Sequence, residues 1–212
     1  MSPGKFISLE GVEGAGKSTL ARALQQQLER RGVDVLLTRE PGGTPLAERV
    51  RALLLEHDSE AMNPTAETLL MFAARAIHLD NAVRPALAAG RWVICDRFTD
   101  ASYAYQGAGR GVSTLLLDQL AAAVHADLWP ARTLLLDLPV EDGLVRARQR
   151  SHAADRFESE QRAFFERVRA AYLQRTREHG ERIRLIDARA TAGQVAAAGW
   201  AAIADLLPGA AE

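Results

Sequence analysis

A glycine-rich segment near the N-terminus has the residue types and the spacing of a phosphate-binding loop. Gly11-Val-Glu-Gly-Ala-Gly-Lys-Ser18 matches G-x-x-x-x-G-K-[ST] at every fixed position. Glycines let the backbone turn so that successive N–H groups point at phosphate oxygens, and the following helix N-terminus adds partial positive charge. Lys17 is expected to reach the β- and γ-phosphates, and the Ser18 hydroxyl to bind Mg²⁺. The expected phosphate contacts are Gly11, Val12, Glu13, Gly14, Ala15, Gly16, Lys17, Ser18 and Thr19.

The basic residues of the chain support this interpretation. They are nearly all arginine, and lysine occurs only at Lys5 and Lys17. Because the chain uses arginine almost everywhere else, the lysine at the fixed position of this motif indicates a specific need for lysine there.

A second candidate site lies at the end of Trp92-Val-Ile-Cys-Asp-Arg97, an apolar run that ends in an acid and an arginine. An acid at the carboxyl end of a strand beside a phosphate-binding loop is where Mg²⁺ is held, often through water. Asp96 fits that role, and Arg97 would face a second phosphate. The alternative is that Asp96 caps the next helix. The base-reading pattern N-K-x-D of GTPases is absent, which weakens the hypothesis of a GTP-driven switch.

Short apolar runs alternate with amphipathic stretches, which predicts an α/β fold. We expect a three-layer P-loop NTPase fold with a five-stranded parallel sheet flanked by helices, in one domain over residues 1–212 whose tail frays from 208 to 212. The expected strands are Lys5–Glu10, Asp34–Thr38, Trp92–Asp96, Arg132–Asp137 and Arg184–Asp187. The expected helices are Ser18–Arg31, Thr44–Leu55, Thr65–Ala89 (with a possible break near Pro85), Thr114–His125, Glu141–Arg150, Glu158–His179 and Thr191–Leu207.

Composition narrows the class of protein. The formal net charge is −1, which argues against a protein built to coat nucleic acid or a membrane. The single cysteine, Cys95, cannot form an internal disulfide, and no apolar run approaches a membrane span or a signal sequence. We therefore expect a cytoplasmic protein. The five histidines show no metal-ligand spacing.

Three further motifs resemble a known family. Thr38-Arg-Glu-Pro-Gly-Gly-Thr44, Asp96-Arg-Phe98 and Ser102-Tyr-Ala-Tyr-Gln-Gly107 stand in the order and spacing of bacterial thymidylate kinases, and the similarity runs from about residue 5 to residue 187. The resemblance implies transfer of the γ-phosphoryl group of MgATP to dTMP, giving dTDP and ADP, and a homodimer. A kinase for another nucleotide or nucleoside stays open, as does a switch or partition-type ATPase.

The resemblance also implies roles for single residues. Arg51 and Arg97 match the arginines that grip the acceptor phosphate, and Arg75 matches the arginine beside the thymine edge. Phe72 matches the aromatic residue that stacks on the base. Many relatives place that aromatic residue four positions before the arginine, where this chain has Met71, so a plain core role for Phe72 stays open.

Five other positions match the deoxynucleoside side of the site. Ser102, Tyr105 and Gln106 match the segment that reads the nucleoside; Gln106 can donate and accept at once, and Tyr105 matches the ring that crowds the 2′ position of the sugar. Glu40 would hold neighbouring arginines or the sugar, unless its turn is purely structural. Glu13 matches an acid thought to orient groups near the acceptor's 3′-hydroxyl and phosphate.

An arginine-rich segment over about residues 146–158 resembles the lid of the family. Arg150 is expected to act on the transferring phosphoryl group, Arg156 on phosphates, and Arg146 by stacking on adenine. The alternative is an exposed helix end whose arginines interact with the helix dipole. The run Gly107-Ala-Gly-Arg-Gly111 stays open between a flexible loop and a ligand contact.

Overall fold

A computed structural model describes residues 4–56, 61–150, 156–157 and 160–207, except the side chain of Arg150. Its centre is a parallel sheet with strand order β2-β3-β1-β4-β5. The strands are β1 (Phe6–Glu10), β2 (Val35–Arg39), β3 (Trp92–Asp96), β4 (Arg132–Asp137) and β5 (Ile183–Asp187). The predicted α/β class and five-stranded parallel sheet are thus confirmed, with strand ends shifted by at most one residue.

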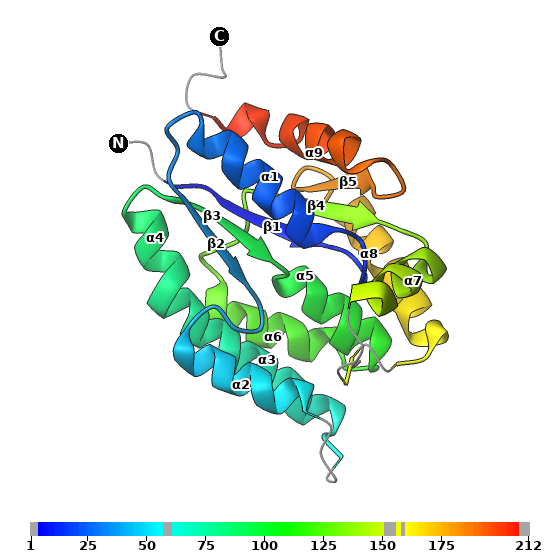
Figure 1. Ribbon diagram of the computed structural model, residues 1–212. Helices are drawn as coiled ribbons and strands as arrows, with labels where there is room; N and C mark the ends of the chain where they lie inside the picture. Colours follow the sequence, from blue (N-terminus) through cyan, green and yellow to red (C-terminus); the bar gives the residue numbers. More distant parts are fainter. Residues whose placement is uncertain (1–3, 57–60, 151–155, 158–159, 208–212) are drawn as a thin grey trace.

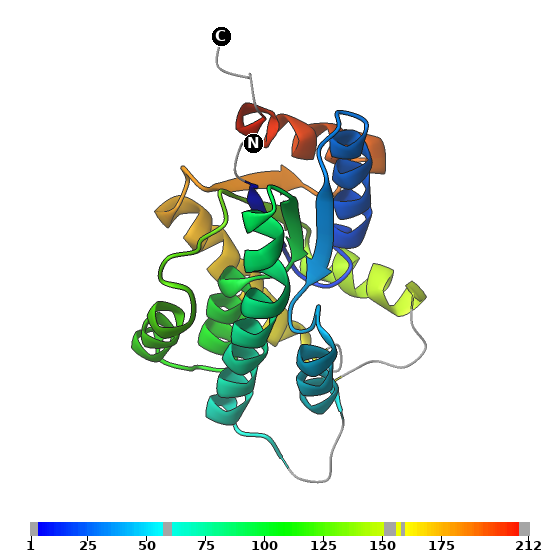
Figure 2. The ribbon, with the colours of Figure 1, turned by 90° about the vertical axis from the view of Figure 1, so that its left-hand side faces the viewer.

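Helices cover both faces of this sheet (Figures 1 and 2). One face carries α1 and α9, and the other carries α3 to α6 and α8. The remaining α-helices, α2 and α7, lie beyond the carboxyl ends of the strands. The bounds are α1 (Lys17–Glu29), α2 (Pro45–Leu55), α3 (Pro64–His78), α4 (Arg84–Ala88), α5 (Thr99–Ser102), α6 (Thr114–His125), α7 (Val140–Arg150), α8 (Arg162–Glu178) and α9 (Ala192–Ala201). None of the helices in the described part of the chain is long and apolar enough to cross a membrane.

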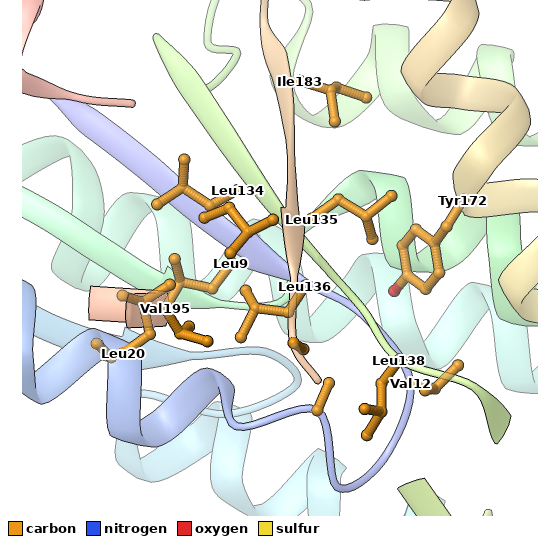
Figure 3. Packing of buried hydrophobic residues seen from close by; sticks show 14 of the residues in the cluster. Leu9, Val12, Leu20, Leu134, Leu135, Leu136, Leu138, Tyr172, Ile183 and Val195 are labelled. Atoms are coloured by element: carbon orange, nitrogen blue, oxygen red, sulfur yellow. The ribbon is translucent and has the colours of Figure 1, made fainter. Parts of the chain in front are cut away.

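The main core lies between the central strands and the helices on either face (Figure 3). Leu9 of β1 and Leu134 of β4 gather with Leu20 of α1 and Val195 of α9. The opposite face of the sheet packs against α8, which contributes the buried Tyr172. Because β1, β3 and β4 are buried on both faces, their near-continuous apolar sequences are those expected of central parallel strands.

Local signals explain where two of the helices begin. Thr44 precedes Pro45, and its side chain accepts a hydrogen bond from the N–H of Ala47 at the start of α2. Asn63 precedes Pro64 and caps α3 in the same way. Both pairs combine a capping side chain with proline at the first helical position, where no N–H is needed.

The long helix predicted over residues 65–89 is three segments in succession. After α3, a π-helical turn (Leu79–Val83) leads directly into α4. Pro85 lies in the first turn of α4, has no N–H to donate and would clash with a carbonyl in a regular helix. The expected break is therefore a π-helical turn, in which the backbone hydrogen bonds change from the α-helical to the π-helical pattern, and the chain continues without a loop.

The segment after β3 is also helical, which the sequence analysis did not predict. α5 is followed at once by a second π-helical segment (Tyr103–Gly109) that packs against α8. Gly109 is buried, and a β-carbon there would overlap the ring of Phe164. The glycine run was expected to be either a flexible loop or a ligand contact. At Gly109 the structure supports neither, because the lack of a side chain there lets the π-helical segment pack closely on α8.

The last two helices are shorter than predicted. α8 begins at Arg162, and the stretch expected to be helical up to Leu207 ends at Ala201, followed by a 3₁₀ turn (Ala204–Leu206). Thr191 and Gln194 form a capping box at the start of α9, as their spacing allows.

Candidate active site

A cavity of about 250 Å³ opens at the carboxyl ends of β1, β2 and β3. Many of the predicted site residues line it, although they come from positions 13 to 106. The lining residues are Glu13, Gly14, Gly16, Lys17, Ser18, Arg39, Glu40, Pro41, Arg51, Leu55, Met71, Arg75, Asp96, Arg97, Phe98, Ala101, Ser102, Tyr105, Gln106 and Phe157.

The phosphate-binding loop forms one end of this cavity. Lys17 begins α1, and its ammonium group donates to the carbonyls of Gly11 and Val12, both at 3.1 Å. Burial, together with nearby Arg97, lowers the pKa of Lys17 to about 8. A bound phosphate would oppose that effect, because its negative charge favours the protonated amine. Val12 and Ala15 are buried in the core, so their side chains shape the loop from behind.

Ser18 and Asp96 lie together at the same end. The Ser18 hydroxyl donates to Asp96 Oδ2 at 3.1 Å, although the two residues are 78 positions apart. α5 begins at Thr99 with no side-chain cap, so the alternative of Asp96 as a helix cap is not supported. A hydroxyl and a carboxylate are hard oxygen ligands, and their pairing fits Mg²⁺ held between the loop and β3.

Arg97 connects the loop to the opposite wall. Its guanidinium donates to Glu13 at 2.7 Å, to the Gly11 carbonyl at 3.1 Å and to the Tyr172 hydroxyl at 3.3 Å. It also stacks on Tyr105, with 4.6 Å from Cζ to the ring centroid. The Tyr105 hydroxyl donates to Glu13 in turn. Arg97 has φ of 73°, an uncommon backbone conformation for a residue with a β-carbon.

Glu10 supports the segment around Arg97 through hydrogen bonds to two of its neighbours. The sequence analysis gave Glu10 no role in the site. Its two carboxyl oxygens lie 2.7 Å from the Phe98 N–H and from the Tyr172 hydroxyl. Both partners adjoin Arg97, one through the backbone and one through a hydrogen bond. Burial, reinforced by Asp100, raises the pKa of Glu10 to about 8. The left-handed turn at Arg97 is therefore braced from inside the core.

The other end of the cavity contains Arg75 and its partners. Arg75 Nε donates to Glu40 at 2.7 Å, and Nη2 donates to the Ser102 hydroxyl at 3.1 Å. Although burial acts to raise it, Arg75 and His78 hold the pKa of Glu40 below its usual range. Arg75 Nη1 is buried and has no hydrogen-bond partner in the described chain. An unpaired buried donor beside a cavity is costly unless a ligand acceptor completes it.

Phe72 is not among the residues that line the cavity. Its side chain is 2% exposed and packs with Leu117 and Ala121 of α6, and its ring centroid lies 4.6 Å from Cζ of Arg75. Met71, one position earlier, lines the cavity. Adjacent helical residues point about 100° apart, so only one of the two can face the ligand. The burial of Phe72 favours the core role, and its stacking on the base stays a prediction.

The arginine-rich segment is placed only in part. Arg146 lies on α7 outside the cavity, where its Nη1 donates to the Ala188 carbonyl after β5. The side chain of Arg150, and residues 151–155, lie outside the described chain. Arg156 donates to the Leu54 carbonyl at 2.9 Å and to Glu67 at 2.6 Å. Its expected contact with ATP phosphates stays a prediction.

Other lining residues were missed in the sequence. Arg39 lies at the exposed rim and pairs with Glu48, whose carboxylate also accepts from the Gly43 N–H. Leu55 and Phe157 close the apolar side. Arg39 belongs to the Thr38–Thr44 motif, so its position in that motif was a signal that could have identified it. Leu55 and Phe157 carry no such signal.

One buried group resembles a metal site by composition. Ligand atoms of Glu40, His78 and Cys95 lie within 4.8 Å of one another. Each already has a partner: Glu40 pairs with Arg75, His78 bonds Thr38, and the Cys95 thiol donates to the Arg97 carbonyl. Burial raises the pKa of Cys95 well above its usual value, which disfavours the thiolate that would bind a metal. We assign no metal to this group.

Comparison with known proteins agrees with the geometry. Residues 9–198 match the family model described as thymidylate kinase. The chain is 59% identical to a thymidylate kinase of Pseudomonas syringae pv. syringae over 92% of each sequence. It is 54% identical to one of Alkalilimnicola ehrlichii, covering 89% of this chain and 87% of the relative. The crystal structure of thymidylate kinase from Ehrlichia chaffeensis superposes with a TM-score of 0.72 at 33% identity, covering 87% of this chain and 93% of that one. This chain belongs to the thymidylate kinase family.

Proposed function

We propose that the protein transfers the γ-phosphoryl group of ATP to dTMP, giving ADP and dTDP. The observation that carries the proposal is a single cavity with a phosphate-binding loop at one end and the unpaired donor of Arg75 at the other. Lys17 would hold the β- and γ-phosphates of ATP. The base of the acceptor would lie near Arg75, Gln106 and Met71, so that its phosphate points back toward the loop.

Arginines between the two ends are placed to hold the acceptor phosphate. Arg97 and Arg51 both line the cavity, and Arg51 Nη1 donates to the Pro41 carbonyl at 2.8 Å. Guanidinium groups match phosphate through paired N–H donors. Glu13, held by Arg97 and Tyr105, would keep Arg97 oriented and lie near the 3′-hydroxyl. Phosphoryl transfer depends chiefly on such positioning and charge, so no general base is needed.

Mg²⁺ fits the pair formed by Ser18 and Asp96. When bound there, the ion would supply positive charge that neutralises the charge developing during transfer. Ser18 and Asp96 would hold the ion, because Ser18 is fixed at the start of α1 and Asp96 at the end of β3.

Several finer features stay predictions. These are a single kinase domain over residues 1–212, a lid over about 146–158, a homodimer and a cytoplasmic location. We also retain Arg150 as the arginine acting on the transferring phosphoryl group, since it ends α7.

A panel of nucleoside monophosphates tests the proposal, with ADP release measured by a coupled assay. We expect dTMP to be the preferred acceptor. dUMP lacks only the base methyl group, which contributes about 1–3 kcal/mol in an apolar pocket, so it should be slower by roughly tenfold or more. Equal or faster turnover of dCMP, AMP or GMP would refute the proposed acceptor. ATP hydrolysis independent of any acceptor would instead favour a switch ATPase.

A further inference from the structure

Glu67 is a buried carboxylate behind the cavity that none of the roles above uses. It lies in the first turn of α3 and is 1% exposed. Its Oε1 accepts from Gln106 Nε2 at 2.8 Å, and its Oε2 accepts from Arg156 at 2.6 Å. Arg110 Nε lies 3.3 Å from the same Oε2. A buried carboxylate paired with two guanidinium groups offers acceptors only.

That chemistry determines how the amide of Gln106 is oriented. Gln106 is 1% exposed yet lines the cavity, whereas Glu67 does not line it. Because a carboxylate cannot donate, the nitrogen of the amide must face Glu67. The amide oxygen then lies on the other arm of the planar group, and no donor among the described residues bonds to it. An amide flip would place oxygen against oxygen and remove the hydrogen bond that Glu67 Oε1 accepts from Gln106.

We propose that Glu67 is a positioning residue for base selectivity, because it presents only the acceptor of Gln106 to the base. This inference rests on the proposed function. Thymine and uracil carry a ring N3–H donor, whereas the N3 of cytosine is an acceptor. Arg75 Nη1 is a buried donor with no partner among the described residues, and it complements a carbonyl and opposes an exocyclic amine. An acceptor from Gln106 and a donor from Arg75 that line the same cavity therefore match the imide edge of thymine and reject cytosine.

Glu67→Gln tests the proposal with little change in shape. A glutamine at position 67 can donate as well as accept, so Gln106 can adopt either amide orientation. We expect the ratio of kcat/KM for dTMP to that for dCMP to fall by about tenfold or more, since sites built on fixed hydrogen bonds lose discrimination when those bonds are relaxed. A role confined to folding or to holding Arg156 would lower both values by the same factor and leave the ratio unchanged.

Glu160→Gln is the matched control. Glu160 accepts from Arg110 Nη1 at 2.5 Å, so this variant makes the same chemical change on the other side of the same arginine without touching Gln106. We expect its selectivity ratio to stay within about twofold of the wild type. An equal loss of selectivity in both variants would overturn the proposal, because the cause would then be the charge on Arg110.

Two further measurements keep the outcome decisive. In a Gln106→Leu background, Glu67→Gln should change the ratio no further, because the two residues act as one unit; an additive effect would overturn the proposal. Should Glu67→Gln fail to fold by circular dichroism, Glu67→Asp keeps the charge but withdraws it from Gln106, and the same fall is expected. The wild-type panel separates the hypotheses: a wild type that prefers dCMP sinks the proposed function, whereas unchanged selectivity in the variants sinks only the role of Glu67.

Discussion

Glu10 is the group whose ionisation should dominate the pH dependence of stability near neutrality. It is fully buried at the end of β1, where burial and then Asp100 raise its pKa to about 8. In the unfolded chain the same carboxyl titrates near 4.5. Between these values the folded chain binds more protons than the unfolded chain, so the free energy of unfolding falls as pH rises. The stability contributed by the neutral carboxyl is complete below pH 4.5 and is lost as pH rises to about 8.

The size of the effect follows from that difference in pKa. One proton contributes about 1.36 kcal/mol for each pH unit, so the interval from 4.5 to 8 corresponds to roughly 5 kcal/mol. His125 acts in the opposite direction below pH 6.5, because burial lowers its pKa to about 4. Lys17 acts in the opposite direction only above about pH 8. The clearest decline is therefore expected between pH 6.5 and 8, where it amounts to about 2 kcal/mol.

Glu10→Gln isolates this contribution. The amide resembles the neutral carboxyl, with an oxygen for the Phe98 N–H and an NH₂ group that can donate to the Tyr172 hydroxyl. Urea unfolding of both proteins between pH 5 and 8.5 gives the comparison, and Glu29→Gln on the exposed face of α1 controls for loss of a charge. The variant should lose the decline between pH 6.5 and 8. Parallel curves for wild type and Glu10→Gln would refute the reasoning.

Three other outcomes follow from the site. Lys17→Ala should lower kcat by roughly 10²–10³-fold in a folded protein, because its ammonium acts on phosphates in the transition state; near-normal kcat would contradict the loop assignment. Phe72→Ala should cost about 3–5 kcal/mol of stability in thermal unfolding, whereas Met71→Ala should chiefly raise the KM for dTMP; the reverse pattern would return Phe72 to the base. Arg150→Ala should lower kcat at least about a hundredfold with a much smaller change in the KM for dTMP, and Arg148→Ala less; kinetics that spare Arg150→Ala would assign the charge to another residue.

The strands and the phosphate-binding loop were predictable because their signals are local. β3 and β4 are apolar runs with the bounds expected of them, and the loop is a backbone conformation encoded by consecutive residues. The π-helical turns were not predictable in this way. The second of them contains Gly109, which packs against the ring of Phe164 in α8, and the periodicity of one segment does not report such a contact.

The site residues also differ in whether their signals in the sequence are local. Motif residues such as Ser18 and Asp96 could be proposed because each carries its own chemistry at a strand or helix end. Glu10 and Glu67 could not, because their roles depend on distant partners: Tyr172 lies 162 positions from Glu10, and Arg156 lies 89 positions from Glu67. An acid inside an apolar stretch is the only local signal that either residue gives.

Phe72 shows a further limit. The sequence placed an aromatic residue within one position of the expected site, but the rotation of α3 about its axis decides which side chain faces the ligand. That rotation is determined by packing against α6, where Phe72 fills the space beside Leu117. Spacing within a single helix cannot report a contact made by another helix.

The phosphate-binding loop and α7 are in contact through two glycines that pack directly against each other. Gly14 has φ of 75°, and a β-carbon there would overlap the carbonyl of Gly143 in α7. A β-carbon at Gly143 would meet the Glu13 carbonyl in the same way. An arginine in the loop at position 14 would therefore be incompatible with this packing, which holds the start of α7 against the phosphate-binding loop.

The same contact places the first turn of α7, a helix rich in arginine, beside the phosphate-binding loop. α7 is the helix whose last turn carries Arg148 and Arg150, and the glycine pair fixes its first turn beside the loop. Charge on the transferring phosphoryl group still has to be balanced by a guanidinium, because Lys17 is a single point charge. The packing of Gly14 on Gly143 excludes an arginine from the loop and places the arginine-rich α7 beside it, which is why the charge is expected from α7.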